Sequence, residues 1–385
     1  MPKLFVELIG KVLDHLDNPA DVLSLLSTCQ FLLHLYSSRY FAMIDGFKFT
    51  DDVLSVTGVE GIHALCVWTT VHASPPQKVN VKFGDDLTAS RKEMAGLVRL
   101  FTSFISSPKP FLHHLSLSLP QTIDTMSLIC LLKTMSARTI HICSNRYSLI
   151  KPSDHQIYDP VCDIPPAGIE HFDISMLLLE DTGLHRCIRQ LLHSNPIKTL
   201  SIVGCGSHCI LAKLCLPQLK VLTVDMECGI ERINSFLAFH PMVDTLYVVG
   251  SPSSFLPPIH HSTNLKALQW LMGPMFAIEH ILANTPSPNL KWLSLFPDYV
   301  KAEIPSNPEA LLHQLATFDE RVAEILSRSI IRVLDLTLPP SWSRVQFAPT
   351  ISQTFLGIKV LFLDGEGYTA NDIAVRTPFL HVFLY

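Results

Sequence analysis

The sequence predicts an α/β fold in which stacked strand–helix repeats, a solenoid, follow a small all-helical module. Two observations predict it: one short aliphatic pattern recurs at nearly even spacing, and helix-like segments lie between its copies. The first part of the 385-residue chain instead shows the apolar stripes of short helices. We therefore expect a helical module over residues 1–45, a transitional segment with degenerate first repeats over 46–110, and a repeat array over 111–385.

The repeated pattern is an aliphatic residue, two of any kind, a second aliphatic, one of any kind, and a third aliphatic. Its last two aliphatic positions alternate, so both side chains lie on one face of a β-strand. From residue 172 onward the middle positions are 22 to 28 residues apart, except for one gap of 41. This is close to the period of leucine-rich repeats, and the array is predicted to be one. The copies are Leu112-Leu115-Leu117, Ile169-Phe172-Ile174, Ile197-Leu200-Ile202, Leu219-Leu222-Val224, Val243-Leu246-Val248, Leu265-Leu268-Trp270, Leu290-Leu293-Leu295, Ile331-Leu334-Leu336 and Ile358-Leu361-Leu363, with degenerate members at Ile140-His141-Ile142 and Leu380-Phe383-Tyr385.

Helices are predicted between these strands, at 182–193, 229–240 and 275–284, because apolar residues recur there at helical spacing. Proline follows closely after each segment and marks the turn back to a strand. A longer helix at 309–328 would fill the gap of 41 as an insertion. A doubly wound sheet also alternates strands and helices, but the short, even gaps and the lack of a glycine-rich phosphate loop favour the solenoid.

The N-terminal module is predicted from two apolar stripes. The first runs from Leu4 to Leu16, and the second starts at Val22, after a break at Asp17-Asn18-Pro19. Two or three short helices form a small core with apolar faces left over, which predicts a partner. A second interpretation is that these helices only cap the end of the array, a function that solenoids need.

The same segment resembles an F-box, whose pattern runs Leu-Pro-x-Glu-Leu, Ile-Leu-x-x-Leu, Asp-Leu-Leu and Cys-Arg-aromatic. The sequence has Phe5 where the family has proline and Gln30 where it has a basic residue. With the repeats behind it, the chain resembles F-box proteins with divergent leucine-rich repeats, of the kind abundant in mushroom-forming fungi. The matching residues are Leu4, Glu7, Leu8, Leu13, Leu16, Asp21, Leu23, Leu25, Cys29 and Phe31.

The resemblance implies a non-catalytic adaptor, the substrate receptor of an SCF-type cullin–RING ubiquitin ligase. Its helices would dock on a Skp-type linker, and its repeats would hold an unidentified protein substrate for ubiquitin transfer. The alternative is a leucine-rich-repeat scaffold that binds a protein partner without any ligase. The residues expected to contact the linker are Leu4, Leu8, Leu13, Leu16, Leu23, Leu25 and Phe31.

The substrate is expected on the concave strand face, where side chains between the aliphatic positions point away from the core. Aromatic side chains are the types that most often anchor interfaces. The candidates are Tyr247, Gln269, Trp292, Asp335 and Phe362.

Composition and motifs argue against other classes. A net charge of −5 disfavours nucleic-acid binding. The sequence predicts neither a signal peptide nor a membrane span, so a cytoplasmic or nuclear protein is expected. We expect no catalytic residues, no cofactor and no metal site. The thiols and imidazole at Cys205, His208, Cys209 and Cys215 lack the spacing of a zinc site, and no motif of a hydrolase or nucleotide-binding enzyme is present.

Overall fold

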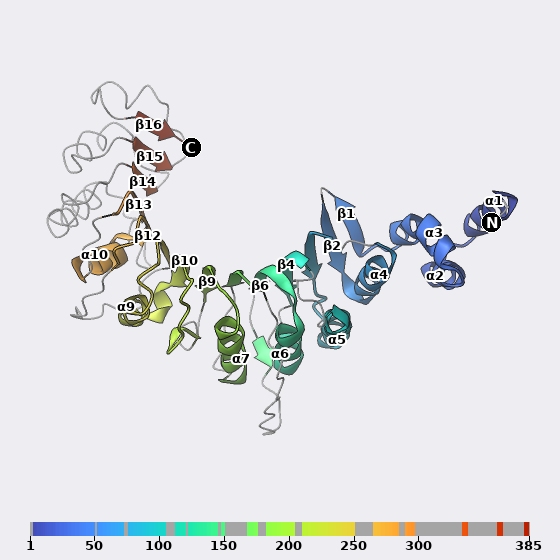
Figure 1. Cartoon of the computed structure of the whole chain (residues 1–385), viewed down its shortest axis with the longest axis horizontal. Helices are drawn as coiled ribbons and strands as arrows, with labels where there is room; N and C mark the ends of the chain where they lie inside the picture. The colour runs from blue at the N-terminus through green and yellow to red at the C-terminus, as the bar shows by residue number, and fades with distance from the viewer. Residues whose placement is uncertain are drawn as a thin grey trace. The chain divides into compact units, whose positions relative to one another are not determined.

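The chain divides into two compact units, Met1–Glu170 and His171–Tyr385, and both contain strands and helices in an α/β arrangement. The expected boundaries near residues 45 and 110 lie within the first unit. The computed structural model (Figure 1) describes residues 3–50, 52–72, 76–104, 112–120, 122–144, 148–150, 168–175, 182–204, 210–250, 265–284, 289–296, 333–337, 360–364 and 381–384.

The first unit begins with three helices, α1 (Lys3–Leu13), α2 (Pro19–Ser27) and α3 (Gln30–Ala42), as predicted. Asn18 caps α2: its side-chain oxygen accepts a hydrogen bond from the Ala20 N–H at 2.9 Å, and proline at the first helical position costs no hydrogen bond. The helices form their own small core from apolar residues with little or no exposed surface, namely Leu13, Val22, Leu26 and Leu32.

The strands of the first unit lie side by side in chain order, and all neighbours except β1 and β2 are parallel. One core row pairs Leu54 with Val79, Val79 with Leu115 and Leu115 with Ile140, so the sheet already starts in the segment predicted as transitional. A separate pair is formed by β5 (Thr122–Asp124) and β7 (Ser148–Ile150). The main strands are β1 (Phe47–Thr50), β2 (Val53–Thr57), β3 (Lys78–Lys82), β4 (Leu112–Leu119) and β6 (Ala137–Ser144).

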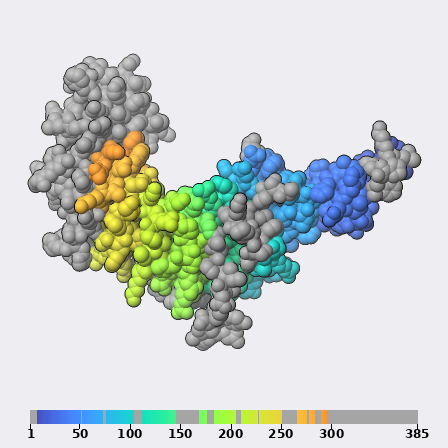
Figure 2. Space-filling model, in the orientation of Figure 1, coloured from blue at the N-terminus to red at the C-terminus, as the bar shows by residue number. Residues whose placement is uncertain are grey.

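The helices between these strands are α4 (Gly58–Val71), α5 (Leu87–Phe104) and α6 (Thr125–Thr134). Each packs against the next, α4 on α5 and α5 on α6, and they lie on one side of the sheet (Figure 1). In the space-filling view the dark blue N-terminal helices join the lighter blue first strands in one continuous surface (Figure 2).

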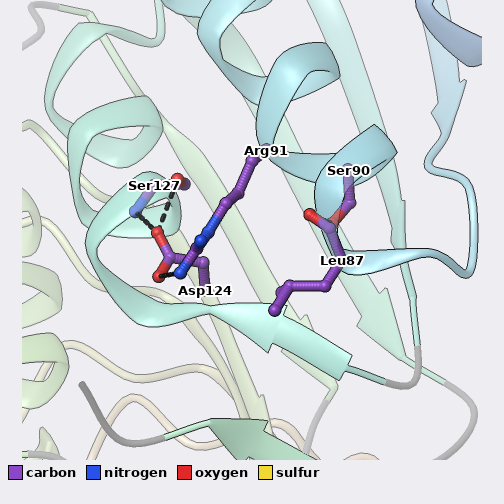
Figure 3. A network of polar contacts seen from close by, with 5 residues as sticks. All are labelled: Leu87, Ser90, Arg91, Asp124 and Ser127. Carbon is purple, nitrogen blue, oxygen red and sulfur yellow. Dashed lines mark hydrogen bonds and ion pairs between the residues drawn. The ribbon is translucent and has the colours of Figure 1, made fainter. Parts of the chain in front are cut away.

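A polar network ties α5 to α6 (Figure 3). Asp124, the N-cap of α6, accepts hydrogen bonds from the Ser127 N–H at 2.9 Å and the Ser127 hydroxyl at 2.6 Å. Arg91 of α5 donates to its other oxygen at 2.8 Å. Burial alone would raise the pKa of Asp124, but the hydrogen bonds from Ser127 and Arg91 outweigh it and hold the pKa below 3.8.

We expect Asp124→Ala to destabilise the first unit by about 1 kcal/mol, because α6 loses its cap and Arg91 loses its acceptor. Asp124→Asn keeps a capping oxygen and should cost less. Because the folded-state pKa is depressed, the charge stabilises above about pH 4 and its contribution fades as pH falls through the folded-state pKa. Hydrogen exchange of α6 amides measures both effects, and equal losses in the two variants would contradict the capping role.

The second unit is a row of parallel strands, again adjacent in chain order. Core positions stay in register: Phe172 pairs with Leu200, Leu200 with Leu222 and Leu222 with Leu246. The strands are β8 (His171–Ser175), β9 (Thr199–Val203), β10 (Val221–Asp225), β11 (Thr245–Val249), β12 (Trp270–Pro274), β13 (Trp292–Phe296), β14 (Val333–Thr337), β15 (Val360–Asp364) and β16 (His381–Leu384).

The predicted copy Leu265-Leu268-Trp270 is wrong in register by three residues. Leu246 pairs with Leu271, not with Leu268, so the three core positions are Leu268, Leu271 and Gly273. Trp270 points away from the core and exposes 41% of its surface. The third position suits a glycine, because a Cβ on Gly273 would lie 3.0 Å from both Cβ and the carbonyl oxygen of Val248, closer than most Cβ contacts.

The helices of the second unit follow the prediction closely. α7 (Thr182–His193) and α10 (Met275–Asn284) have the expected bounds, and α9 (Ile230–Ala238) lies inside the predicted 229–240 after the short 3-10 turn η1 (Met226–Cys228). α9 packs on α10, and Figure 1 shows the three helices on one side of the strands. The predicted helix at 309–328 lies outside the described residues.

Candidate functional site

The N-terminal helices expose large apolar side chains although they have a core of their own. Leu8 and Val12 of α1 are 54% and 50% exposed, and Phe31 and Leu35 of α3 are 49% and 45% exposed. Each pair is four residues apart, the spacing of neighbours on one helix face. We call these four residues the helical apolar set. Val12 and Leu35 were not among the predicted contacts, although this spacing in the sequence could have identified them.

The other predicted linker contacts are placed differently. Leu16, Leu23 and Leu25 are half-buried. Leu13 has no exposed surface, so the prediction that it contacts a partner is corrected: its side chain packs inside the module because it is on the inner face of α1. Leu4 lies in α1, and its side chain is outside the described part.

A pocket of about 540 Å³ opens where α2, α3 and α4 meet, and Leu23 is part of its wall. At its polar end the Tyr40 hydroxyl lies 3.4 Å from His63 Nδ1. Burial raises the pKa of Tyr40, and the Glu60 carboxylate beside it raises it further. The phenol therefore stays protonated at neutral pH and can donate a hydrogen bond.

The second candidate surface lies on the outward side of β11, β12 and β13. Trp270 and Trp292 pair directly across neighbouring strands, and their rings stack with centroids 4.8 Å apart and an interplanar angle of 11°. Tyr247 pairs with Met272, and Met272 with Ser294, in the adjacent row. We call Tyr247, Trp270, Met272 and Trp292 the strand face. Only Trp270 is strongly exposed and the others are partly exposed.

The remaining predicted substrate contacts are placed by the strand register. Gln269 lies just before β12 instead of between the second and third core positions, because of the shifted register described above. Asp335 pairs with Ser294 on one side and with Phe362 on the other, so both belong to the same row as Tyr247 and Met272. Sequence reasoning missed Trp270 and Met272 for the same reason that it misplaced Gln269.

Imidazole groups also gather on the first unit, where His114 pairs with Lys78 across β3 and β4, and Ser116 pairs with His141 across β4 and β6. Burial lowers the pKa of His114, and electrostatic interactions with the nearby His141, Lys78 and His113 side chains lower it further. No group of three metal-binding side chains occurs within the residues that the structure describes. Of the cysteines named in the sequence analysis, Cys215 is exposed and forms no disulfide. Residues 205–209 lie outside the described part of the chain.

A scan against models of known protein families finds no match for the chain, and a search of curated proteins finds none either. Among the described helices, none is both long enough and apolar enough to cross a lipid bilayer.

Proposed function

We propose that the chain is a non-catalytic adaptor, an F-box-like substrate receptor of an SCF-type ubiquitin ligase. The N-terminal helices dock on a Skp-type linker, and the strand face receives a protein substrate. The repeats form a leucine-rich-repeat solenoid behind the helical module.

The strand order supports the solenoid over a doubly wound sheet. In both units every strand is followed in space by the next strand of the same sheet in the chain, whereas a doubly wound sheet reverses its order at a switch point. The intervening helices pack on each other on one side of each sheet, whereas a doubly wound sheet has helices on both faces. Stacked repeats in which each unit contacts only its neighbours have this order.

The helical apolar set is the observation that carries the docking proposal. Four large apolar side chains, each about half exposed, belong to a module whose core is already filled by other residues. Covering such side chains with a partner removes apolar surface from water at about 25 cal/mol per Å². The pocket beside Leu23 offers a place for a partner side chain, as in helix-in-groove docking.

Leu8→Asp is expected to reduce co-purification of the full chain with a Skp-type linker by at least tenfold, because a carboxylate would be desolvated in the interface. Met242→Asp is the matched control, since Met242 is 59% exposed and lies in the second unit. It should leave linker binding unchanged. The measurement is pull-down of a purified linker, with circular dichroism to verify folding of both variants.

Failure of the wild-type chain to retain the linker would overturn the ligase proposal. If the chain still bound a protein partner through the strand face, the scaffold without a ligase would be the correct function. Equal loss in Leu8→Asp and Met242→Asp would exclude the N-terminal helices as the docking element.

A further inference from the structure

We propose that a pocket in the second unit of this chain binds a small amphipathic carboxylic acid, a molecule with one apolar chain and one carboxylate. The pocket lies between α9 and residues 211–215, so it does not include the strand face. The inference therefore goes beyond the adaptor function and does not depend on it. Three features of the pocket carry the inference: an apolar lining, two cations at its edge, and walls that are held in place without a ligand.

The pocket has the size and the lining of a small-molecule site. Its volume is about 530 Å³, within the range of roughly 300–1,000 Å³ that is typical of ligand sites. Leu211, Leu214 and Phe236 line it and are themselves buried, whereas Phe239 lines it and exposes 75% of its surface. An apolar ligand can therefore rest on the core and cover the exposed ring of Phe239, which removes apolar surface from water.

The two walls of the pocket are joined by one buried histidine. The His240 ring accepts a hydrogen bond from the Leu216 N–H at 2.9 Å, directly after residues 211–215, and its other nitrogen donates to the Phe236 carbonyl of α9 at 2.6 Å. The ring also stacks on Phe236, which lines the pocket. Because these contacts fix α9 against the segment before β10, the cavity is formed before a ligand arrives, and binding needs little reorganisation.

Positive charge lies at the edge of the pocket. Lys213 and Arg232 both line it and are exposed, and Ser235 adds a hydroxyl donor. None of the described lining residues carries a carboxylate, and neither cation takes part in an ion pair within the described part of the chain. Glu231 is next to Arg232 in α9, but successive residues of a helix lie about 100° apart around its axis, and Glu231 is not among the lining residues. The pocket therefore presents two cations to one anionic group.

Lys213 has an unusual backbone conformation. It lies in a turn that is closed by a hydrogen bond from the Leu214 N–H to the Leu211 carbonyl at 3.2 Å. Its φ is 61°, in the left-handed region that glycine adopts freely and that residues with a Cβ adopt rarely. Unfavourable conformations of this kind cluster at binding sites, so a lysine at this position favours a role for its charged side chain.

A carboxylate on an apolar chain fits this chemistry better than a phosphate or a peptide. One arginine and one lysine suffice for a carboxylate, whose two oxygens match the guanidinium group, whereas a phosphate dianion presents three oxygens and needs more donors. A peptide would bring backbone N–H and C=O groups into the pocket. Apart from Ser235 and Cys215 the uncharged lining side chains are apolar, so those backbone groups would be desolvated without partners.

The test is isothermal titration calorimetry of the full chain with decanoate. Saturable binding is expected, with a dissociation constant on the order of 100 μM. Decanol and decylamine have the same apolar chain without a negative charge, and they should bind about tenfold more weakly because they lose the charge-assisted hydrogen bonds to the two cations.

Substitutions separate the charged part of the site from its apolar part. The double variant Lys213→Gln with Arg232→Gln should weaken decanoate binding by about tenfold and leave decanol binding unchanged. Phe239→Ala should weaken the binding of both molecules by about fivefold. Lys220→Gln and Met242→Ala are the matched controls, since both residues are exposed, lie in the second unit and do not line the pocket. Both controls should bind decanoate normally.

The thiol of Cys215 reports whether the ligand occupies this pocket. Cys215 lines the pocket, is exposed and forms no disulfide, so saturating decanoate should slow its alkylation by N-ethylmaleimide several-fold. The rate at Cys130, which is exposed but lies in α6 of the first unit, should not change. Mass spectrometry of the two peptides measures both rates. Ser235→Trp places a large ring in the cavity and should abolish decanoate binding.

The proposal is overturned if decanoate does not bind saturably, if decanol binds as tightly as decanoate, or if decanoate protects Cys215 and Cys130 equally. It is also overturned if a second copy of the chain covers the pocket, which light scattering would show as a dimer that Phe239→Ala dissociates. None of these results concerns linker binding by the N-terminal helices, which the Leu8→Asp experiment tests separately.

Discussion

Replacing Phe172 with alanine is expected to lower the free energy of unfolding of the second unit by about 3–5 kcal/mol. Phe172 is 1% exposed and is among the largest fully buried side chains of the described core. It lies in β8 beside Leu200 of β9, so its loss leaves a cavity beside two neighbouring parallel strands. Neighbouring strands cannot close this cavity without breaking the backbone register.

Amide hydrogen exchange in β8 and β9 measures this effect, because it reports the opening of individual segments in a chain with two units. Phe239→Ala is the matched control: Phe239 is 75% exposed, and its loss should change stability by less than about 0.5 kcal/mol. Similar effects of the two substitutions would show that the inward-facing aliphatic and aromatic residues of these strands do not form the core.

His240→Ala is expected to cost roughly 1–3 kcal/mol at neutral pH, because the buried Leu216 N–H loses its partner and the Phe236 carbonyl keeps only its bond from the Phe239 N–H. The His240 ring is 2% exposed. Its Nε2 accepts the Leu216 N–H at 2.9 Å, so Nδ1 carries the proton and donates to the Phe236 carbonyl at 2.6 Å. The ring also stacks on Phe236 with centroids 3.9 Å apart. The neutral form thus joins the end of α9 to the turn before β10.

The same geometry makes this contribution depend on pH. Burial lowers the pKa of His240 below 6.5, although the bond to the Phe236 carbonyl acts in the opposite direction. A lowered pKa means that the unfolded chain takes up the proton first as pH falls. The contribution is therefore complete above about pH 6.5 and is lost as pH falls through the folded-state pKa.

The measurement is the difference in stability between the wild type and His240→Ala, compared at about pH 7.5 and about pH 5. The difference should shrink at the lower pH. Taking the difference cancels the other histidines, which titrate in both proteins. A difference that stays constant, or grows, would contradict a neutral bridging imidazole.

The strand positions could be predicted wherever three aliphatic residues mark a strand. The prediction failed where a strand departs from that pattern. At β12 the third core position is Gly273, which has no side chain and so does not fit the aliphatic pattern. Trp270 was therefore taken for the third core residue, although it points away from the core. A lysine directly follows the first aliphatic residue in five copies of the pattern, at Lys198, Lys220, Lys266, Lys291 and Lys359. Lys198, Lys220 and Lys291 each precede a strand by one residue, but before β12 this place belongs to Gln269 instead of Lys266.

The helical module shows a second limit of sequence reasoning. The stripe from Leu4 to Leu16 correctly predicts a helix, but it does not tell which of its leucines face inward. Leu13 is buried and Leu8 is half exposed, a difference set by the contacts of α1 with the following helices. Tertiary packing decides which leucines face inward. When the apolar stripe of a helix is wider than the core it packs on, the sequence alone does not identify the buried residues.

The contact between α3 and the first strand has a mechanical consequence. Phe41 of α3 stacks on Phe47 of β1 with ring centroids 4.8 Å apart, and both rings lie within 6 Å of the indole of Trp68 in α4. The three packed rings fix α3 against β1, whereas a glycine- and serine-rich linker would let the two elements move independently. A partner bound to α3 would therefore be held in a fixed position relative to the first strands, and lengthening the chain between Ala42 and Phe47 should let that partner move relative to them.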